Sequence, residues 1–395
     1  MNMKYRRFGR TELQMPVLSC GGMRYHENWD GVAPHDIPDG GQENVDAIVH
    51  RALELGINHI ETARGYGESE KQLGRVLPSL PRDKMIIQTK VGPGENAREF
   101  YETFNTSMGL LKLDHVDLLS FHGINTPEIL EQVLRPGGCM EQARKIQKEG
   151  RANFIGFSTH APEAMITRAC ATGEFDYYNV HWYFVNDLNW PSIEEATRQD
   201  MGVFIISPTD KGGKLQEPSA KMSELCRPLS PMQFNDLYCL QRPQVHTLSI
   251  GAARPTDFDE HIGAMNYMDK VEATIAPIEA RLRQEMESVL GRDWCRSWNE
   301  GLPDAAQIPG EVNVLEILRL WTYAKPLDLI EWGKMRYNLL GNAGHWFPGR
   351  NAGDFDEQTL APFLAASPFS DRIPMILREA HEMLIGEERK RMTEA

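Results

Sequence analysis

The sequence alternates short apolar runs with amphipathic stretches between residues 17 and 265. Eight runs have the length and composition of buried strands: 17–21, 57–61, 85–90, 116–122, 153–157, 177–181, 203–207 and 245–250. Helix-like stretches separate or follow them, at 43–55, 69–76, 99–111, 140–149, 162–171, 192–200 and 256–265. Strands joined through helices run parallel, so the pattern predicts the α/β class. An open, doubly wound sheet is the alternative, but eight successive units favour a closed (β/α)8 TIM barrel.

The pattern changes after residue 265. A charged helix-like stretch covers 269–290, and we predict a break at Pro277 because proline lacks the backbone N–H that a helix needs. Further helical stretches lie at 314–323, 327–338 and 373–385, between the loops 291–310 and 341–356. The 395 residues therefore predict two domains, a barrel over 1–265 and a helical C-terminal domain over 266–395 without a predicted role.

Composition and charge exclude several classes of function. A hydrophobic content of 41% with 25% charged residues is typical of a globular protein, and the sequence has no apolar run long enough to span a membrane. The net charge of −14 argues against general binding to nucleic acid. The first residues carry charge without an apolar stretch, so we predict no signal peptide.

The six cysteines are scattered along the chain, at positions 20, 139, 170, 226, 239 and 295. They lack the paired spacing of metal ligands, so the sequence predicts reduced thiols, a cytoplasmic protein and no metal site. The sequence is compatible with a monomer or an oligomer.

Polar residues stand at the ends of three successive predicted strands. Glu61 ends the strand at 57–61, and Tyr66 follows it between two glycines that leave room for the backbone to turn. Lys90 ends the strand at 85–90 and His122 ends the strand at 116–122. In a parallel barrel all these strand ends lie on one face, where catalytic residues gather. The sequence therefore predicts one polar cluster at that face.

The cluster and its surroundings resemble the aldo-keto reductase superfamily. The motifs that carry the resemblance follow in chain order at 65–70 (GYGESE), 155–158 (IGFS), 206–208 (ISP) and 211–213 (KGG). The resemblance covers about residues 3–265, and it implies a hairpin over 6–16 that closes the bottom of the barrel. The sequence departs from the family at Glu61, where the family has aspartate.

The resemblance implies a catalytic tetrad made of Glu61, Tyr66, Lys90 and His122. Tyr66 would donate the proton, helped by Lys90, because a free phenol with a pKa of ~10 donates poorly without a cation beside it. Glu61 would hold Lys90, and His122 would orient the substrate carbonyl. If the backbone is unchanged, the longer Glu61 would overshoot Lys90 or tilt, and Arg64 would compete for its carboxylate.

The same resemblance implies a nicotinamide cofactor. The segment after the strand at 203–207 resembles a pyrophosphate-binding loop, through Ser207, Pro208, Lys211, Gly212 and Gly213, with Lys214 as a second cation. The segment after the last strand resembles a loop that binds the adenosine 2′-phosphate, which favours NADPH, through Gly251, Ala252 and Arg254. The family binds the carboxamide where this sequence has Ser158, Thr159 and Asn179, although it usually has Ser-Asn and Gln there.

Two further motifs have simpler interpretations. Residues 92–97 (GPGENA) match a Rossmann glycine fingerprint in form, but Pro93 removes an amide and Glu95 would repel phosphate, so we predict a strand-to-helix turn. The C-terminal segment loosely resembles the ferredoxin-like appendage that some barrels of this superfamily carry. Because a cluster needs about four thiolates and residues 266–395 contain Cys295 alone, we predict no iron–sulfur cluster.

The sequence therefore predicts an NADPH-dependent oxidoreductase that reduces a small-molecule aldehyde or ketone to an alcohol. The alternative is a catalytically weakened, nicotinamide-binding regulatory or scaffold protein, in which Glu61 has cost turnover. Consumption of NADPH with a panel of aldehydes distinguishes the two.

Overall fold

The structure is a computed structural model, and it describes residues 3–25, 31 and 36–391. The described chain divides by its contacts into two compact units. The first contains residues up to 183, 187–208 and 236–268, and the second contains 184–186, 209–235 and the residues from 269 onward. The predicted domain boundary between residues 265 and 266 remains a prediction.

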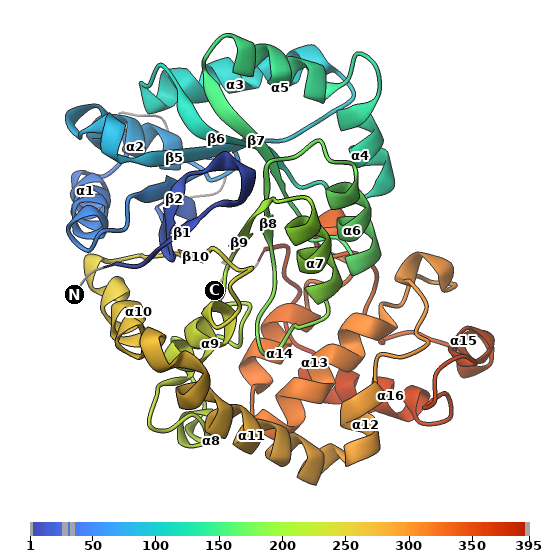
Figure 1. Ribbon diagram of the computed structural model, residues 1–395. Helices are drawn as coiled ribbons and strands as arrows, with labels where there is room; N and C mark the ends of the chain where they lie inside the picture. The colour runs from blue at the N-terminus through green and yellow to red at the C-terminus, as the bar shows by residue number, and fades with distance from the viewer. Residues whose placement is uncertain (1–2, 26–30, 32–35, 392–395) are drawn as a thin grey trace. The chain divides into compact units, whose positions relative to one another are not determined.

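Within the described residues of the first unit, eight parallel strands close into a barrel in the order β10-β3-β4-β5-β6-β7-β8-β9 (Figure 1). Their bounds are β3 Leu18–Gly21, β4 His59–Glu61, β5 Ile86–Val91, β6 Val116–His122, β7 Ala152–Ser158, β8 Tyr177–Val180, β9 Gly202–Ile205 and β10 Thr247–Ile250. Because β10 pairs with both β3 and β9, the sheet has no free edge there, which excludes the open sheet. The predicted (β/α)8 barrel is confirmed.

The helices of this part of the chain follow the strands as the sequence predicts, with shifts of a few residues at their ends. Their bounds are α1 Asp39–Glu54, α2 Ser69–Val76, α3 Ala97–Leu111, α4 Pro127–Leu134, α5 Cys139–Lys148, α6 Glu163–Ala171, α7 Trp190–Arg198, α8 Ala220–Leu225, α9 Pro231–Leu240 and α10 Phe258–Ala264. Three of these helices, α4, α8 and α9, were not predicted. Helix α4 begins after Thr126, whose side chain accepts a hydrogen bond from the amide of Ile129. Thr-Pro at a helix start is a signal that the sequence offers, since proline suits the first turn.

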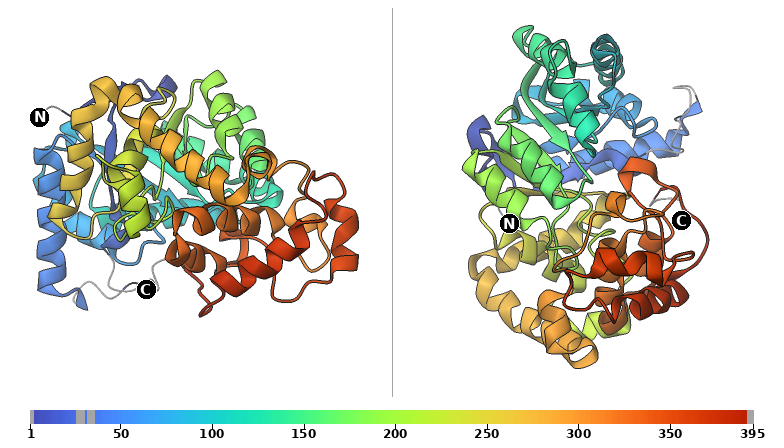
Figure 2. Two further views of the ribbon diagram at one scale, coloured as in Figure 1. Left: turned by 90° about the horizontal axis from the view of Figure 1, so that it is seen from below. Right: turned by 90° about the vertical axis from the view of Figure 1, so that its right-hand side faces the viewer.

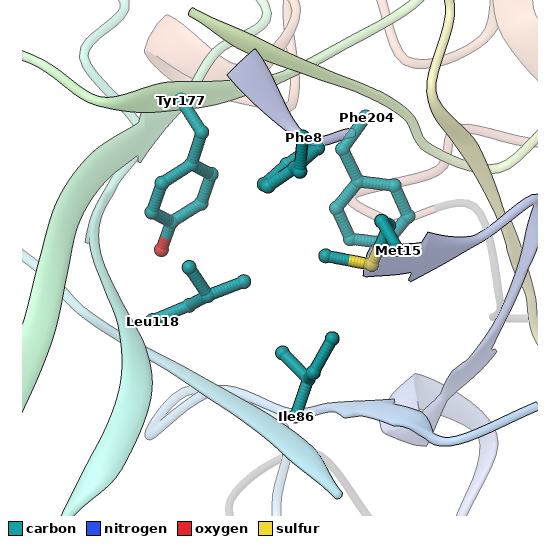
Figure 3. Close-up of a cluster of buried hydrophobic side chains, with 6 residues drawn as sticks. All are labelled: Phe8, Met15, Ile86, Leu118, Tyr177 and Phe204. Atoms are coloured by element: carbon teal, nitrogen blue, oxygen red, sulfur yellow. The ribbon is translucent and has the colours of Figure 1, made fainter. Parts of the chain in front are cut away.

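An antiparallel hairpin of β1 (Tyr5–Arg7) and β2 (Gln14–Pro16) precedes the barrel. It contributes Phe8 and Met15 to a buried cluster whose other members come from four barrel strands: Ile86, Leu118, Tyr177 and Phe204 (Figure 3). Gly202 leaves space for the Phe8 side chain, because an added Cβ at this position would lie 2.6 Å from the Phe8 ring. The hairpin predicted to close the barrel is confirmed.

The second unit is mainly helical, as predicted for the C-terminal segment (orange to red in Figure 2). Its helices after residue 268 are α11 Val271–Leu290, α12 Arg292–Ser297, α13 Val314–Leu327, α14 Ile330–Tyr337, α15 Glu357–Leu364 and α16 Ile373–Leu384. Helix α13 packs against α11, α14 and α16.

The predicted break at Pro277 is wrong, because α11 runs through this residue. Pro277 is exposed, so water can reach the carbonyl that it leaves without a helical partner, while Ile275, Ile278 and Leu282 bury one continuous stripe.

No helix in the described ranges is both long and apolar enough to cross a membrane. The six cysteines are free thiols, and Cys295 is half-buried while the others are buried. Across the described residues, no group of three or more His, Cys, Asp or Glu side chains could hold a metal ion. The absence of an iron–sulfur cluster remains a prediction.

Candidate active site

The four predicted tetrad residues lie at the C-terminal ends of neighbouring barrel strands. Glu61 is the last residue of β4, Lys90 lies near the end of β5, and His122 is the last residue of β6. Tyr66 lies in the loop between β4 and α2, where the amide of Tyr66 bonds the carbonyl of Ala63 and so turns the chain back. Parallel pairing of these strands brings the four side chains to one face of the barrel.

Lys90 is the centre of the cluster. Its side chain is 1% exposed, and its ammonium donates to a carboxylate oxygen of Glu61, to the carbonyl of Thr62 at 3.0 Å and to the Tyr66 hydroxyl at 3.2 Å. The ammonium also lies 4.7 Å from the centre of the Tyr66 ring. The sequence expectation that the longer Glu61 would overshoot Lys90 is therefore wrong for this geometry, because the contact is made.

The protonation states follow from burial and from the charges nearby. Burial alone would lower the pKa of Lys90, but Glu61 and Tyr66 oppose it and raise the pKa of Lys90 above its ordinary value. Burial raises the pKa of Tyr66, and Lys90 offsets part of this effect. We expected Lys90 to lower the pKa of the phenol, and the net direction is opposite because burial outweighs the cation. At neutral pH the cluster therefore holds a charged lysine beside a protonated tyrosine.

His122 packs edge-on against Tyr66, with ring centres 5.6 Å apart and an angle of 83° between the ring planes. The imidazole and the phenol are therefore direct neighbours. This placement suits a group that shares a substrate oxygen with the tyrosine.

Arg64 does not compete for Glu61. Its guanidinium donates at 2.9 Å to Glu70, a carboxylate that is 1% exposed at the start of α2. The second oxygen of Glu70 accepts from the hydroxyl of Thr89 at 2.7 Å, so Glu70 anchors the Tyr66 loop to β5. The predicted competition is therefore wrong, since the sequence did not show that α2 supplies Arg64 with its own carboxylate.

The three residues predicted to bind a carboxamide differ in whether they have a hydrogen-bond donor that is not already used within the protein. Thr159 donates its hydroxyl to the carbonyl of Ile124 at 2.8 Å, so its proton is used within the protein. Ser158 accepts from the amide of Gly123 at 3.1 Å, which leaves its own proton for another acceptor. The Nδ2 atom of Asn179 is buried and has no hydrogen-bond partner among the described residues. Ser158 and Asn179 therefore fit a carboxamide, which needs donors for its oxygen.

The predicted pyrophosphate loop begins in strained backbone. Ser207, just after β9, has a φ of 52°, a left-handed conformation that is uncommon for residues other than glycine. Gly213 has a φ of 137°, which side chains rarely adopt. Such strain persists where the surrounding structure holds it, and it often accompanies ligand-binding loops.

From Thr209 onward this loop belongs to the second unit. Trp332 on α14 donates its indole N–H to the carbonyl of Lys211 at 3.0 Å. The Lys211 side chain is buried, and burial, followed by the nearby Arg336 guanidinium, holds its pKa well below the ordinary value. Lys214 forms an ion pair with Glu217 at 2.8 Å. The two lysines predicted to face pyrophosphate therefore both have close charged neighbours in the second unit.

The loop after β10 carries the residues predicted for the 2′-phosphate. Ala252 is buried, whereas the Arg254 side chain is 76% exposed and lies 3.2 Å from the Asp257 carboxylate. Asp257 also accepts from the amides of Ala253 and Arg254, at 2.9 and 3.0 Å. The exposed Arg254 guanidinium therefore suits a phosphate at the surface, but the Asp257 carboxylate would compete with that phosphate for the guanidinium.

Comparison with known proteins decides the family. The sequence profile of the Aldo/keto reductase family matches residues 18–242, more than half of the chain. The chain belongs to the aldo/keto reductase family. Members of this family of oxidoreductases are generally NAD(P)H-dependent enzymes that act on small-molecule carbonyl compounds, although some are channel subunits.

Individual relatives are distant. L-galactose dehydrogenase of Arabidopsis thaliana is 30% identical over 159 residues, 38% of this chain and 49% of its own length. L-glyceraldehyde 3-phosphate reductase of Escherichia coli is 28% identical over 177 residues, 41% and 46% of the two chains. The chain thus spans about half the length of these two enzymes. A candidate potassium channel subunit beta of Schizosaccharomyces pombe is 24% identical over 69% of this chain and 91% of its own.

Solved structures support the fold. An aldo-keto reductase of Bacillus halodurans, in its holo form, aligns with a TM-score of 0.59 and 19% identity over 71% of this chain and 96% of its own. An aldo-keto reductase of Klebsiella pneumoniae in complex with NADPH aligns with a TM-score of 0.54 and 17% identity over 70% and 96%. Members of the family thus bind NADPH.

Three residues near the candidate site were not predicted from the sequence. Ser249 on β10 donates to Glu61 at 3.0 Å. Arg24 packs beside Gly251, where an added Cβ would lie 3.4 Å from its Nε atom. Asp257 pairs with Arg254. Only the last had a readable signal, because an acidic residue three positions after an arginine at a helix start often pairs with it.

Proposed function

We propose that this protein is an NADPH-dependent reductase that converts an aldehyde or ketone to the alcohol, in the cytoplasm. The observation that carries the proposal is the simultaneous contact of Lys90 with Glu61 and with the Tyr66 hydroxyl. Burying an ammonium costs free energy, and the Glu61 carboxylate offsets this cost for Lys90. The charged ammonium in turn stabilises negative charge on the Tyr66 oxygen, so this arrangement favours proton donation by Tyr66.

NADPH, held by the loops described below, would supply a hydride for the carbonyl carbon. Tyr66 gives its hydroxyl proton to the carbonyl oxygen, on which negative charge develops. The phenolate left on Tyr66 lies beside Lys90, whose positive charge stabilises it until solvent returns a proton. His122, which packs edge-on against Tyr66, would orient the same oxygen. Glu61 keeps Lys90 charged in a buried position.

Cofactor binding in the proposal uses the loops after four strands. Ser158 and Asn179 take the carboxamide, Thr159 shapes the loop beside it, and Arg254 takes the 2′-phosphate of NADPH. The segment after β9 would hold the pyrophosphate, with these predicted contacts: Ser207, Pro208, Lys211, Gly212 and Gly213. Gly251 and Ala252 belong with Arg254 to the loop predicted for the 2′-phosphate. The strained backbone at Ser207 supports a ligand-binding role for this segment.

The test uses the full-length protein and NADPH deuterated at the transferred position. Consumption of NADPH with members of an aldehyde panel, with deuterium recovered on the alcohol carbon, is the expected result. Tight NADPH binding without turnover of any panel member would overturn the reductase assignment. That outcome would favour the regulatory alternative, which the similarity to a candidate channel subunit also supports.

A further inference from the structure

Both oxygens of the Glu61 carboxylate have a partner. One oxygen accepts from Lys90, and the other, Oε1, accepts from the Ser249 hydroxyl at 3.0 Å. The three side chains are buried, with Glu61 3% and Ser249 7% exposed. A hydroxyl in such a place limits the carboxylate to one orientation, because rotation would break a charge-assisted hydrogen bond in a low-dielectric site.

The contact reaches across one strand of the barrel. Ser249 lies on β10 and Glu61 on β4, and β3 runs between them, paired with both. The residue of β3 opposite Glu61 is Gly21. An added Cβ at Gly21 would lie 2.6 Å from the Ser249 Oγ atom and 3.1 Å from Glu61 Oε1. The φ of Gly21 is −88°, which any residue adopts, so the space is what this glycine provides.

This arrangement accounts for a glutamate where the family has aspartate. The extra methylene extends the carboxylate toward β10 through the space beside Gly21, where the Ser249 hydroxyl donates a hydrogen bond to it. An aspartate at position 61 is shorter by one carbon–carbon bond, roughly 1.5 Å. It cannot keep Lys90 on one oxygen and Ser249 on the other in the same backbone.

We propose that Ser249 is a positioning residue of the reductase, which holds the Glu61 carboxylate across Gly21 so that its other oxygen meets Lys90. The inference rests on the proposed function. It assigns Ser249 no contact with substrate or cofactor, so the residue acts on the chemical step through Glu61 and Lys90.

The test is a double-mutant cycle in the full-length protein, with Ser249→Ala and Glu61→Asp. Loss of a hydrogen bond to a charged group should lower kcat for Ser249→Ala by roughly 10- to 100-fold, with KM for the aldehyde and Kd for NADPH within about twofold. In the Glu61→Asp background, the same Ser249→Ala change should alter kcat by less than about twofold, because the shorter carboxylate does not use the hydroxyl. Equal losses in the two backgrounds would indicate general damage to the barrel and overturn the proposal.

The matched control is Ser19→Ala on β3. Its hydroxyl is buried and bonds His59 and Thr247, at 2.7 and 2.6 Å, without touching the tetrad. A kcat close to that of the parent is expected for this variant. If Ser249→Ala does not fold, Gly21→Ala replaces it, since its methyl group would push the Ser249 hydroxyl away from Glu61 while leaving it present. Unchanged kcat in folded Ser249→Ala or Gly21→Ala, with an active parent, refutes the positioning role alone; a parent without turnover refutes the proposed function as well.

Discussion

The ammonium of Lys90 lies 3.2 Å from the Tyr66 hydroxyl and 4.7 Å from the centre of its ring. The cation therefore approaches the phenol close to its oxygen and also stands above its face. Both contacts favour negative charge on the oxygen, so they strengthen as the proton leaves.

Tyr66→Phe should retain cofactor affinity and lose turnover. The ring that packs on His122 stays, and the proton donor is removed. We expect kcat and kcat/KM to fall together by roughly 10²- to 10⁴-fold, because a positioned general acid contributes that much. Steady-state kinetics with chemistry shown to be rate-limiting measures this. Reduction at the parental rate would remove Tyr66 from the mechanism.

In Glu61→Gln, the loss of activity that occurs at alkaline pH should begin at a lower pH than in the parent. Without the carboxylate, burial lowers the pKa of Lys90, and the pKa of Tyr66 also falls because Glu61 raises it. Both groups then lose their protons earlier as pH rises. The alkaline limb of the kcat profile should move down by about one pH unit or more.

The control for this shift is Glu70→Gln, which makes the same change in a buried carboxylate nearby. Glu70 bonds Arg64 and Thr89, so the alkaline limb should stay in place. An equal shift in the two variants would mean that Lys90 does not depend on Glu61 in particular.

Arg254→Ala should reduce the preference for NADPH over NADH, because the exposed guanidinium is proposed to meet the 2′-phosphate. Asp257→Asn should increase the preference, roughly 3- to 10-fold, since it removes the competing charge and keeps an oxygen for the two amides. Fluorescence titration with each cofactor gives the two Kd values. Asp259→Asn, which removes a carboxylate paired with Arg51, should leave the preference as it is. Equal affinity of the parent for NADPH and NADH contradicts the assignment of Arg254.

The barrel should lose stability as pH falls from about 6.5 to 5. Burial, and then the charge of Lys90, lowers the pKa of His59 to about 3 from 6.5. In this pH range His59 is therefore protonated in the unfolded chain and neutral in the folded protein. The loss from His59 alone is about 2 kcal/mol over this range. His246, with a pKa lowered to about 4, acts in the same direction.

Urea unfolding of the parent and of His59→Gln at pH 7 and pH 5 measures this effect. The variant should be less stable at pH 7 and should lose less stability on acidification. His115→Gln, which changes a half-buried histidine before β6, should follow the parent. A parallel loss in His59→Gln and the parent would show that another group is responsible.

Trp332→Phe should weaken NADPH binding and leave kcat at saturating cofactor near the parental value. The change removes the indole N–H that holds the Lys211 carbonyl, and one neutral hydrogen bond is worth roughly a 2- to 10-fold change in Kd. Trp321→Phe is the matched control in the same unit, because its indole N–H has no partner among the described residues. If both variants weaken binding equally, the effect comes from packing of the unit.

Much of the barrel and of its site could be predicted because both follow from local patterns. Apolar runs that end in a polar residue mark barrel strands, and closure brings those ends together without further information. Glu61, Lys90 and His122 were placed in this way, and the glycines around Tyr66 marked its turn.

The partners of these residues could not be predicted, because they come from strands and helices that are distant in sequence. Ser249 is 188 residues from Glu61 and becomes its neighbour when the last strand closes against the first. The sign of the pKa shift of Tyr66 depended on how deeply the phenol is buried, which no spacing reveals. The sequence predicted that Lys211 faces pyrophosphate but not that its side chain is buried, because the indole that bonds its backbone carbonyl comes from a helix more than a hundred residues further along the chain.

Residues 209–235 share their contacts with the helices that follow residue 268. Besides Trp332, Lys221 pairs with Glu285 and Arg281 bonds the carbonyl of Leu225. A chain ended at residue 265 would keep the whole barrel strand set and lose every one of these partners. If two relatives exchanged only their C-terminal segments, each would keep its own 209–235 segment and receive helices that do not match it. The two segments are therefore expected to evolve together, although they are separated in the sequence.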